Sequence, residues 1–117
     1  MTNPLGKKIA SPDKFSPNIL FSISRADQRL GMTHAFRGKD IWNLHEVIWI
    51  NKMGKVFHNE LSVVIDASSP CTVESKSLKL FVNSLIHKRF NSLSEVKKIL
   101  KRHLEKLTES KIQIKSI

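Results

Sequence analysis

The amino-acid sequence predicts a small α+β domain built on an antiparallel sheet. Three features support this class: residues 40–66 have the alternating pattern of a β-hairpin, two amphipathic helical segments follow, and residues 111–115 alternate again. The resulting order, β-β-α-α-β, places both helices on one face of the sheet. A length of 117 residues with 40% apolar residues suits one domain with its own core.

The first strand of the hairpin is expected at residues 40–51, which are rich in Ile, Val and Trp. Strict alternation assigns one face to Trp42, Leu44, Ile48 and Ile50 and the other to Asn43, His45 and Asn51. It also predicts Trp42 and Trp49 on opposite faces, one in the core and one free to meet a neighbouring subunit. A short connection containing Gly54 leads to a second strand over 56–66, in which Leu61, Val63 and Ile65 form the apolar face.

The segment after the hairpin predicts two helices. Pro70 excludes a strand or helix interior in the turn-forming stretch 67–72. A first helix is expected over 77–86, where apolar residues recur at helical spacing at Leu78, Phe81, Val82 and Leu85. The sequence Ser92-Leu93-Ser94-Glu95 fits a capping box and predicts the start of a second helix. The apolar stripe of that helix is Val96, Ile99, Leu100, Leu104 and Leu107.

Residues 1–39 are interpreted as an N-terminal arm, and residues 40–117 as the folded module. The arm contains three of the four prolines and shows little periodicity. Its apolar residues Phe15, Ile19, Leu20 and Phe21 are expected to hold it against the core. The last strand, at 111–115, leaves the three-stranded sheet with an exposed edge, which predicts a partner strand from another copy or another polypeptide.

The net charge of +10 is concentrated near the end of the chain, where residues 76–117 contain nine Lys and two Arg against three Glu. This excess fits an RNA-binding face, a phosphate-bearing ligand or the solvated side of a Lys-rich helix, and the last is the usual meaning of a charge run. The chain has no Tyr and no interleaving of aromatic and basic residues that would stack single-stranded bases. Nucleic acid is therefore not expected as a partner.

The remaining composition predicts a soluble cytoplasmic protein without a metal site. The apolar run Val47–Ile50 is far shorter than the roughly 20 residues that span a bilayer, and no charged-then-apolar leader opens the sequence. The single cysteine, Cys71, has no partner for an internal disulfide. The five histidines lack the paired spacing of metal ligands.

The most specific signal is residues 73–84, Val-Glu-Ser-Lys-Ser-Leu-Lys-Leu-Phe-Val-Asn-Ser. They resemble the Glu-Ser-Lys-Ser-hydrophobic-Lys-Leu-aromatic motif of the 7-cyano-7-deazaguanine reductases, enzymes of queuosine biosynthesis that reduce a nitrile to a primary amine. Residues 38–43, with Glu46, Trp49 and Asn51, resemble the first strand of that family. Leu5-Gly6-Lys7 and residues 25–31 resemble its N-terminal arm.

The resemblance implies a tunnelling-fold (T-fold) module with a binding site for 7-cyano-7-deazaguanine at Val73, Glu74 and Ser75 and for NADPH at Ser75 and Lys76. The chemistry is consistent, because one carboxylate at Glu74 can accept both adjacent N–H groups of a guanine-like ring. A helix N-terminus with an ammonium group suits phosphate oxygens, and Lys79 shares the helical face of Lys76. Without the resemblance, Glu74 reads as a surface carboxylate with helical ion pairs.

The resemblance also implies what the chain lacks. In this family a Cys thiolate attacks the nitrile and an Asp donates a proton, and in two-module members both belong to the second half. No catalytic residue is therefore expected here, and the family's second substrate-binding His-Glu pair is absent as well. Cys71 lies three residues before Glu74, away from the family's nucleophile position, and is expected to be an ordinary buried thiol. The T-fold module is expected to be incomplete at its C-terminus.

Three hypotheses for the function remain open. The first is the N-terminal part of an NADPH-dependent nitrile reductase that forms 7-aminomethyl-7-deazaguanine, inactive without a Cys-bearing second module. The second is a non-catalytic T-fold binding or assembly module, or the remnant of a split gene, acting as a homo-oligomer or with a second T-fold module. The third, a small basic RNA-binding protein, is supported only by the charge.

Overall fold

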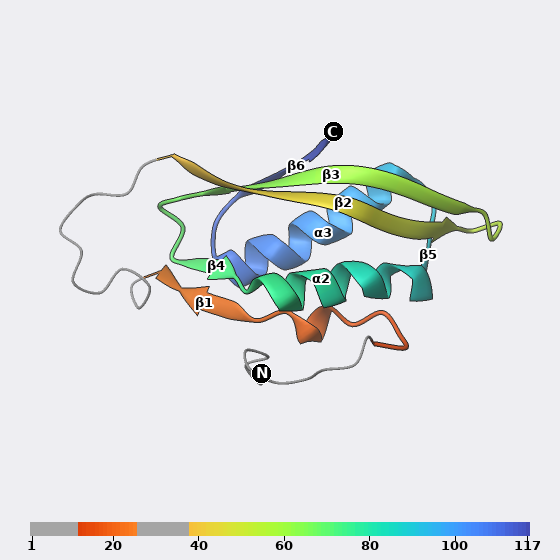
Figure 1. Ribbon diagram of the computed structural model, residues 1–117, viewed down its shortest axis with the longest axis horizontal. Helices are drawn as coiled ribbons and strands as arrows, with labels where there is room; N and C mark the ends of the chain where they lie inside the picture. The colour runs from red at the N-terminus through yellow and green to blue at the C-terminus, as the bar shows by residue number, and fades with distance from the viewer. Residues whose placement is uncertain (1–11, 26–37) are drawn as a thin grey trace.

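A long β-hairpin forms one layer of the protein, and two helices form the other (Figure 1). The computed structural model describes residues 12–25 and 38–117. In chain order the elements are η1 (Pro17–Ile19), β1 (Ser22–Ser24), β2 (Lys39–Asn51), β3 (Val56–Asp66), β4 (Cys71–Val73), α2 (Ser75–Asn83), η2 (Ser84–His87), β5 (Arg89–Phe90), α3 (Leu93–Thr108) and β6 (Ile112–Ser116). The α+β class predicted from the sequence is confirmed.

The main sheet has four strands in the order β5-β2-β3-β6, so the expected three-stranded sheet is wrong in number. The β2–β3 and β3–β6 pairs are antiparallel, and β5 pairs with the end of β2 in parallel. A second, two-stranded sheet joins β1 to β4. The three strands missed by the sequence prediction, β1, β4 and β5, are only two or three residues long. Such short strands show no alternation.

A β-bulge in β2 changes which side chains face the core. The register shifts between Leu44, which pairs with Leu61, and Val47, which pairs with Asn59, so β2 carries one extra residue there. Beyond the bulge Val47 and Trp49 are buried, whereas Ile48 is 39% exposed. Trp42 also packs against the core. The predicted placement of Trp42 and Trp49 on opposite faces is therefore wrong, and Ile48 does not share the inward face of Trp42 and Leu44.

The hairpin turn follows from its sequence. The side chain of Asn51 accepts the backbone N–H groups of Met53 and Lys55 at 3.0 and 2.8 Å. Gly54 has a φ of 86°, which other residues rarely adopt, and its N–H donates to the carbonyl of Asn51 at 3.0 Å. The turn therefore closes β2 onto β3 as the sequence predicts.

Both predicted helices are present. α2 continues into the 3-10 turn η2, and the predicted helix 77–86 falls within their combined range of 75–87. At the start of α3 the hydroxyl of Ser92 accepts the N–H of Glu95 at 3.3 Å. The carboxylate of Glu95 accepts two hydrogen bonds from Asn91, one from its backbone N–H at 3.4 Å and one from its side-chain amide at 2.6 Å. In a complete capping box this carboxylate would accept the N–H of Ser92. Half of the predicted capping box is therefore formed, because Asn91 competes for the glutamate.

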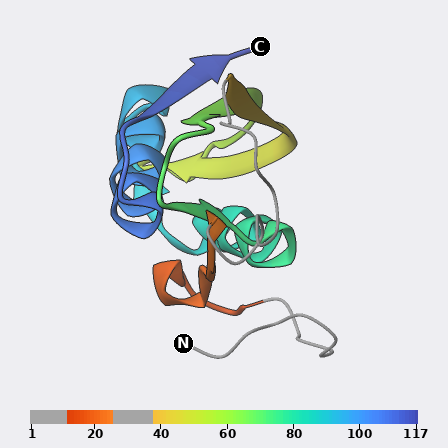
Figure 2. The same cartoon turned by 90° about the vertical axis from the view of Figure 1, so that its left-hand side faces the viewer.

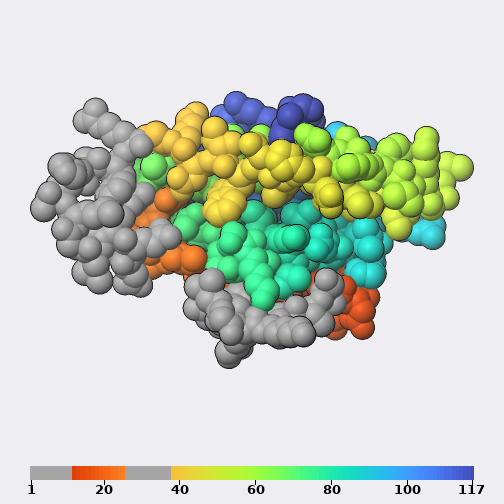
Figure 3. Space-filling model, viewed as in Figure 1, coloured from red at the N-terminus to blue at the C-terminus, as the bar shows by residue number. Residues whose placement is uncertain are grey.

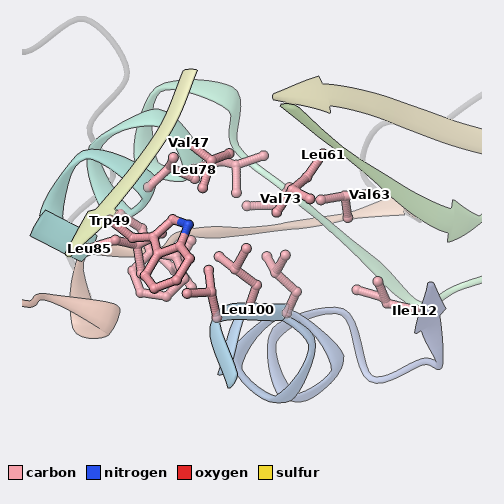
Figure 4. Close-up of a cluster of buried hydrophobic side chains, with 14 of the residues drawn as sticks. Val47, Trp49, Leu61, Val63, Val73, Leu78, Leu85, Leu100 and Ile112 are labelled. Carbon is pink, nitrogen blue, oxygen red and sulfur yellow. The ribbon is translucent and has the colours of Figure 1, made fainter. Parts of the chain in front are cut away.

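The core lies between the sheet and the two helices, which stand on the same side of the sheet (Figures 2 and 4). Phe81 and Phe90 are its largest fully buried side chains. Truncating residues of this kind to alanine typically costs about 3–5 kcal/mol. The remaining buried members are Leu20, Val47, Trp49, Leu61, Val63, Ile65, Val73, Leu78, Val82, Leu85, Val96, Leu100, Leu104 and Ile112.

The described part of the N-terminal segment is held against α2. Leu20 is 2% exposed, and Phe15 and Ile19 pack against the core. The backbone of Phe21 bonds to the helix at both of its polar groups: its N–H donates to the hydroxyl of Ser77 at 3.0 Å, and its carbonyl accepts the N–H of Glu74 at 2.9 Å. The boundary at residue 39 stays a prediction, and the motif residues Leu5-Gly6-Lys7 and 26–31 lie outside the described residues.

Candidate functional site

Glu74 links β4 to α2 and caps the helix. Its two carboxylate oxygens accept the backbone N–H groups of Lys76 at 3.0 Å and Ser77 at 2.8 Å. The hydroxyl of Ser77 donates back to the carbonyl of Glu74 at 2.8 Å. Glu74 is 2% exposed, so its carboxylate is fixed in direction by the first turn of α2. The plain expectation of a solvent-exposed carboxylate is therefore wrong.

The neighbours of Glu74 have different exposures. Val73 is 2% exposed and its side chain belongs to the core, so only its main chain can contact a ligand. Ser75 and Lys76 are exposed at the first turn of α2, where backbone N–H groups lack helical acceptors. Residues 73–76 thus combine a buried carboxylate with an exposed hydroxyl and ammonium group along one short stretch of chain.

A cavity of about 400 Å³ lies between β2 and α2, beside this stretch. Figure 3 shows the face on which these two elements meet. Ser75 and Lys79 line the cavity, whereas Glu74 and Lys76 do not. The structure therefore places the predicted binding residue Ser75 and the supporting Lys79 at the cavity, and leaves Val73, Glu74 and Lys76 outside its lining. The full lining is Trp42, Asn43, Leu44, His45, Glu46, Ser75, Leu78, Lys79, Val82 and Asn83.

The residues that line the cavity from α2 could be predicted from the sequence. Ser75, Lys79 and Asn83 follow one another at four-residue intervals, and Leu78 and Val82 lie on the same face of the helix. Ser75 was predicted as a binding residue and Lys79 as a supporting one, whereas Asn83 and Glu46 were named only within family-like segments and were not assigned to the site. Glu46 also lines an adjoining cavity of about 270 Å³, together with Val82 and Asn83.

Two polar groups of β2 differ in how they are satisfied. The side-chain oxygen of Asn43 accepts the hydroxyl of Ser62 at 2.7 Å. The buried indole N–H of Trp42 has no acceptor among the described residues. His45 is exposed, as expected, and lies 3.7 Å from the carboxylate of Glu60. The cavity therefore has an apolar floor with carboxylate, amide, hydroxyl and ammonium groups around it, which suits a polar heteroaromatic ligand.

Cys71 has the properties of an inert thiol. It lies in β4, half-buried rather than fully buried, with its Sγ 3.5 Å from Oε2 of Glu109. Partial burial raises the pKa of the Cys71 thiol, and the hydrogen bond to Glu109 and the charge of that carboxylate raise it further. The thiol is therefore protonated at neutral pH and is a poor nucleophile. Among residues 12–25 and 38–117, no group of three or more His, Cys, Asp and Glu is placed to hold a metal ion.

The comparisons with known proteins point to one family. The family described as nitrile reductase, 7-cyano-7-deazaguanine-reductase N-term, matches residues 11–116. The chain belongs to this family. Three curated relatives are named NADPH-dependent 7-cyano-7-deazaguanine reductase. The protein of Desulfotalea psychrophila is 33% identical over 96% of this chain, and that of Burkholderia multivorans is 34% identical over 98% of it. The protein of Bordetella parapertussis is 36% identical over 97% of this chain.

This member of the nitrile reductase N-terminal family spans 42–43% of the length of those relatives. The match includes every residue proposed for the site, since Val73 to Lys76 fall within residues 11–116. No helix in the described parts of the chain combines the length and the apolar character needed to cross a membrane.

Proposed function

We propose that this chain is the N-terminal part of an NADPH-dependent nitrile reductase that converts 7-cyano-7-deazaguanine to 7-aminomethyl-7-deazaguanine in queuosine biosynthesis. In this proposal it supplies contacts to the substrate and to NADPH, and a second T-fold module supplies the nucleophilic Cys and the proton-donating Asp. The proposal rests mainly on the buried, oriented carboxylate of Glu74 within a chain of this family.

Capping the helix leaves Glu74 able to bind a ring. An ionised carboxylate has about four acceptor positions on its two oxygens. The N–H groups of Lys76 and Ser77 use one on each oxygen. One further position per oxygen can accept the two adjacent N–H donors of a guanine-like ring, a bidentate and charge-assisted contact. Because Glu74 is 2% exposed, the ring reaches it only after the surrounding chain moves aside.

The neighbouring groups support binding of the substrate and the cofactor. The main chain of Val73 and Ser75 can bond to the ring from either side of Glu74. The exposed hydroxyl of Ser75 and ammonium group of Lys76 stand in the first turn of α2, where both can donate to the phosphate oxygens of NADPH. NADPH supplies hydride when bound. The thiol of Cys71 takes no part, because its raised pKa keeps it protonated.

The proposed partner is a second T-fold module or another copy of the chain. In the described part of the protein β6 pairs only with β3, and β5 covers β2 only at Ile50 and Asn51. The remaining length of β2 and the outer side of β6 are therefore edges that can accept a partner strand. Pairing there extends the sheet and completes the T-fold arrangement that the family resemblance implies.

Calorimetry tests the substrate site. The full chain should release heat on titration with 7-cyano-7-deazaguanine, and Glu74→Ala should abolish that heat. Glu60→Gln, which removes an exposed charge on β3, is the matched control and should bind like the original protein. Equal heats for the original chain and Glu74→Ala would reject the assignment of Glu74.

A second assay separates a reductase from a non-catalytic module. The chain is mixed with a Cys-bearing second module, substrate and NADPH, and the absorbance of NADPH is followed. Consumption that needs both chains supports a split reductase. Substrate binding without NADPH consumption in the mixture supports a binding or assembly module instead.

A further inference from the structure

The surface between α3 and β6 contains a further cavity, of about 490 Å³. Four lysines line it: Lys97, Lys98 and Lys101 from α3, and Lys115 from β6. Ser94, Gln113 and Ile114 complete the lining, and no carboxylate contributes to it. We call this cavity the lysine groove. It shares no residue with the cavity between β2 and α2.

The glutamates of this region are engaged elsewhere. Glu95 bonds to Asn91, and Glu105 accepts the backbone N–H of Ile112 at 2.9 Å. Glu109 contacts the thiol of Cys71. Among the described residues, no ion pair within 4.0 Å is found for the four lysines of the groove. In the described part of the chain, the four ammonium groups of the groove therefore have no carboxylate in direct contact.

The four lysines of the groove repel one another. Lys97 and Lys101 lie four residues apart on α3, where two like charges destabilise a helix. Lys98 lies beside them, and Lys115 faces them from β6. A polyanion in the groove relieves this repulsion, because each ammonium group gains an opposite charge. The groove has the electrostatic character of a binding surface.

We propose that the lysine groove binds a single-stranded nucleic acid through its phosphates. Repeated phosphates along a strand can meet ammonium groups on successive turns of α3, which a single small anion cannot do. The hydroxyl of Ser94, in the first turn of α3, is a further donor of the kind that phosphate oxygens accept. This function is additional to the proposed reductase role and does not depend on it.

The composition of the groove defines the mode of binding. Its lining contains no aromatic residue, so bases are not stacked and no sequence preference is expected. The expectation that nucleic acid is not a partner rested on the missing interleaving of aromatic and basic residues, and binding through phosphates alone does not need it. Affinity then comes from release of counterions and falls steeply with salt.

Fluorescence anisotropy with a labelled oligouridine of about 12 nucleotides tests the proposal on the full chain. Four phosphate contacts on a single strand predict a slope of roughly −3 for the logarithm of the binding constant against the logarithm of the KCl concentration. An oligothymidine of the same length should bind about equally, because the phosphates are the same. No binding of either strand at low salt would overturn the proposal.

The double variant Lys97→Gln/Lys101→Gln should bind roughly tenfold or more weakly at about 0.1 M salt, with a slope less steep by about 1.4. The matched control Lys39→Gln/Lys52→Gln removes the same charge from exposed positions on β2 and the hairpin turn. An equal loss in the control would show that binding follows net charge alone and would overturn the assignment to the groove.

Two further measurements complete the test. Circular dichroism should show that the groove variant and its control are both folded. If Lys97→Gln/Lys101→Gln unfolds, Lys98→Gln/Lys115→Gln takes its place as the groove variant. A glutamate peptide of the same length as the oligouridine should compete poorly. Competition as strong as that of unlabelled oligouridine would identify the partner as an acidic polypeptide and overturn the proposal.

Discussion

Glu74 and Ser77 bond to each other twice across the first turn of α2. The carboxylate of Glu74 accepts the N–H of Ser77 at 2.8 Å, and the hydroxyl of Ser77 donates to the carbonyl of Glu74 at 2.8 Å. Ser77 also accepts the N–H of Phe21 at 3.0 Å. The residue proposed to bind substrate therefore also holds together the helix, β4 and the N-terminal segment.

Glu74→Ala should lower the free energy of unfolding by about 1–2 kcal/mol, because two backbone N–H groups of α2 lose their acceptor. Glu74→Gln should lose less, since the amide oxygen still accepts one N–H. Chemical denaturation followed by circular dichroism measures both values. Ser92→Ala, which removes the cap of α3, is the matched control with an expected loss of about 1 kcal/mol. Equal stability of Glu74→Ala and the original chain would contradict the capping role.

Arg25 and Asp40 should respond unequally to substitution. Arg25 is 5% exposed, and its guanidinium donates to the hydroxyl of Ser69 at 2.9 Å, to the carbonyl of Asp66 at 3.3 Å and to Asp40 at 2.6 Å. Arg25→Ala removes these three contacts of a buried guanidinium and should cost about 2 kcal/mol. Asp40 is 42% exposed at its side chain, so Asp40→Asn should cost only about 1 kcal/mol or less. Denaturant unfolding of both variants measures the two losses in free energy of unfolding. A larger loss for Asp40→Asn than for Arg25→Ala would contradict the prediction.

His103 should make stability depend on pH. Burial against Phe15 and Phe81 lowers the pKa of His103 below its ordinary value, and the charges of Arg102, Lys106 and Lys88 lower it further. The unfolded chain therefore takes up this proton more readily than the folded one as pH falls below about 6.5. The free energy of unfolding should decrease as the pH falls from about 6.5 to the lowered pKa of His103 in the folded state. Above about pH 6.5 the contribution of His103 to stability should be constant.

Thermal unfolding between about pH 5 and 8 measures this effect. His103→Gln should flatten the dependence in that range. A profile for His103→Gln as steep as that of the original chain would exclude His103 as the cause.

Cys71 should react slowly with iodoacetamide at neutral pH, because the thiolate is the reactive form and the pKa of the thiol is raised. Glu109→Gln should speed the reaction by removing one cause of the raised pKa, while the larger effect of burial remains. Mass spectrometry of the alkylated chain gives both rates, with the denatured chain as reference. A native rate equal to the denatured rate would show that the thiol is neither buried nor perturbed.

Much of the fold follows from the sequence because its longer elements have clear periods. The hairpin, both helices and β6 were predicted in the right order, since apolar residues repeat at two-residue or helical spacing in each. The bulge between Leu44 and Val47 was not predicted. The inserted residue is one of two consecutive polar residues, His45 and Glu46, and its sequence does not differ from that of an ordinary outward-facing strand position.

The candidate site was only partly predictable for a different reason. Its residues were identified through a motif, which gives positions but not the direction of side chains. Glutamate is not among the preferred N-cap residues, so its role in ending β4 and starting α2 had no local signal. The cavity lining from β2 depends on the register after the bulge, which the sequence left undetermined.

The extra residue in β2 gives the protein an optical reporter. Since the chain has only two tryptophans and both pack toward the core, their emission reports a single event, the separation of the hairpin from the helices. Trp49 contributes the sharper signal, because its ring stacks on Phe57 at 4.5 Å and its indole N–H donates to Asn59 at 2.9 Å. Intrinsic fluorescence can therefore follow the docking of a partner or ligand on this layer without any added label.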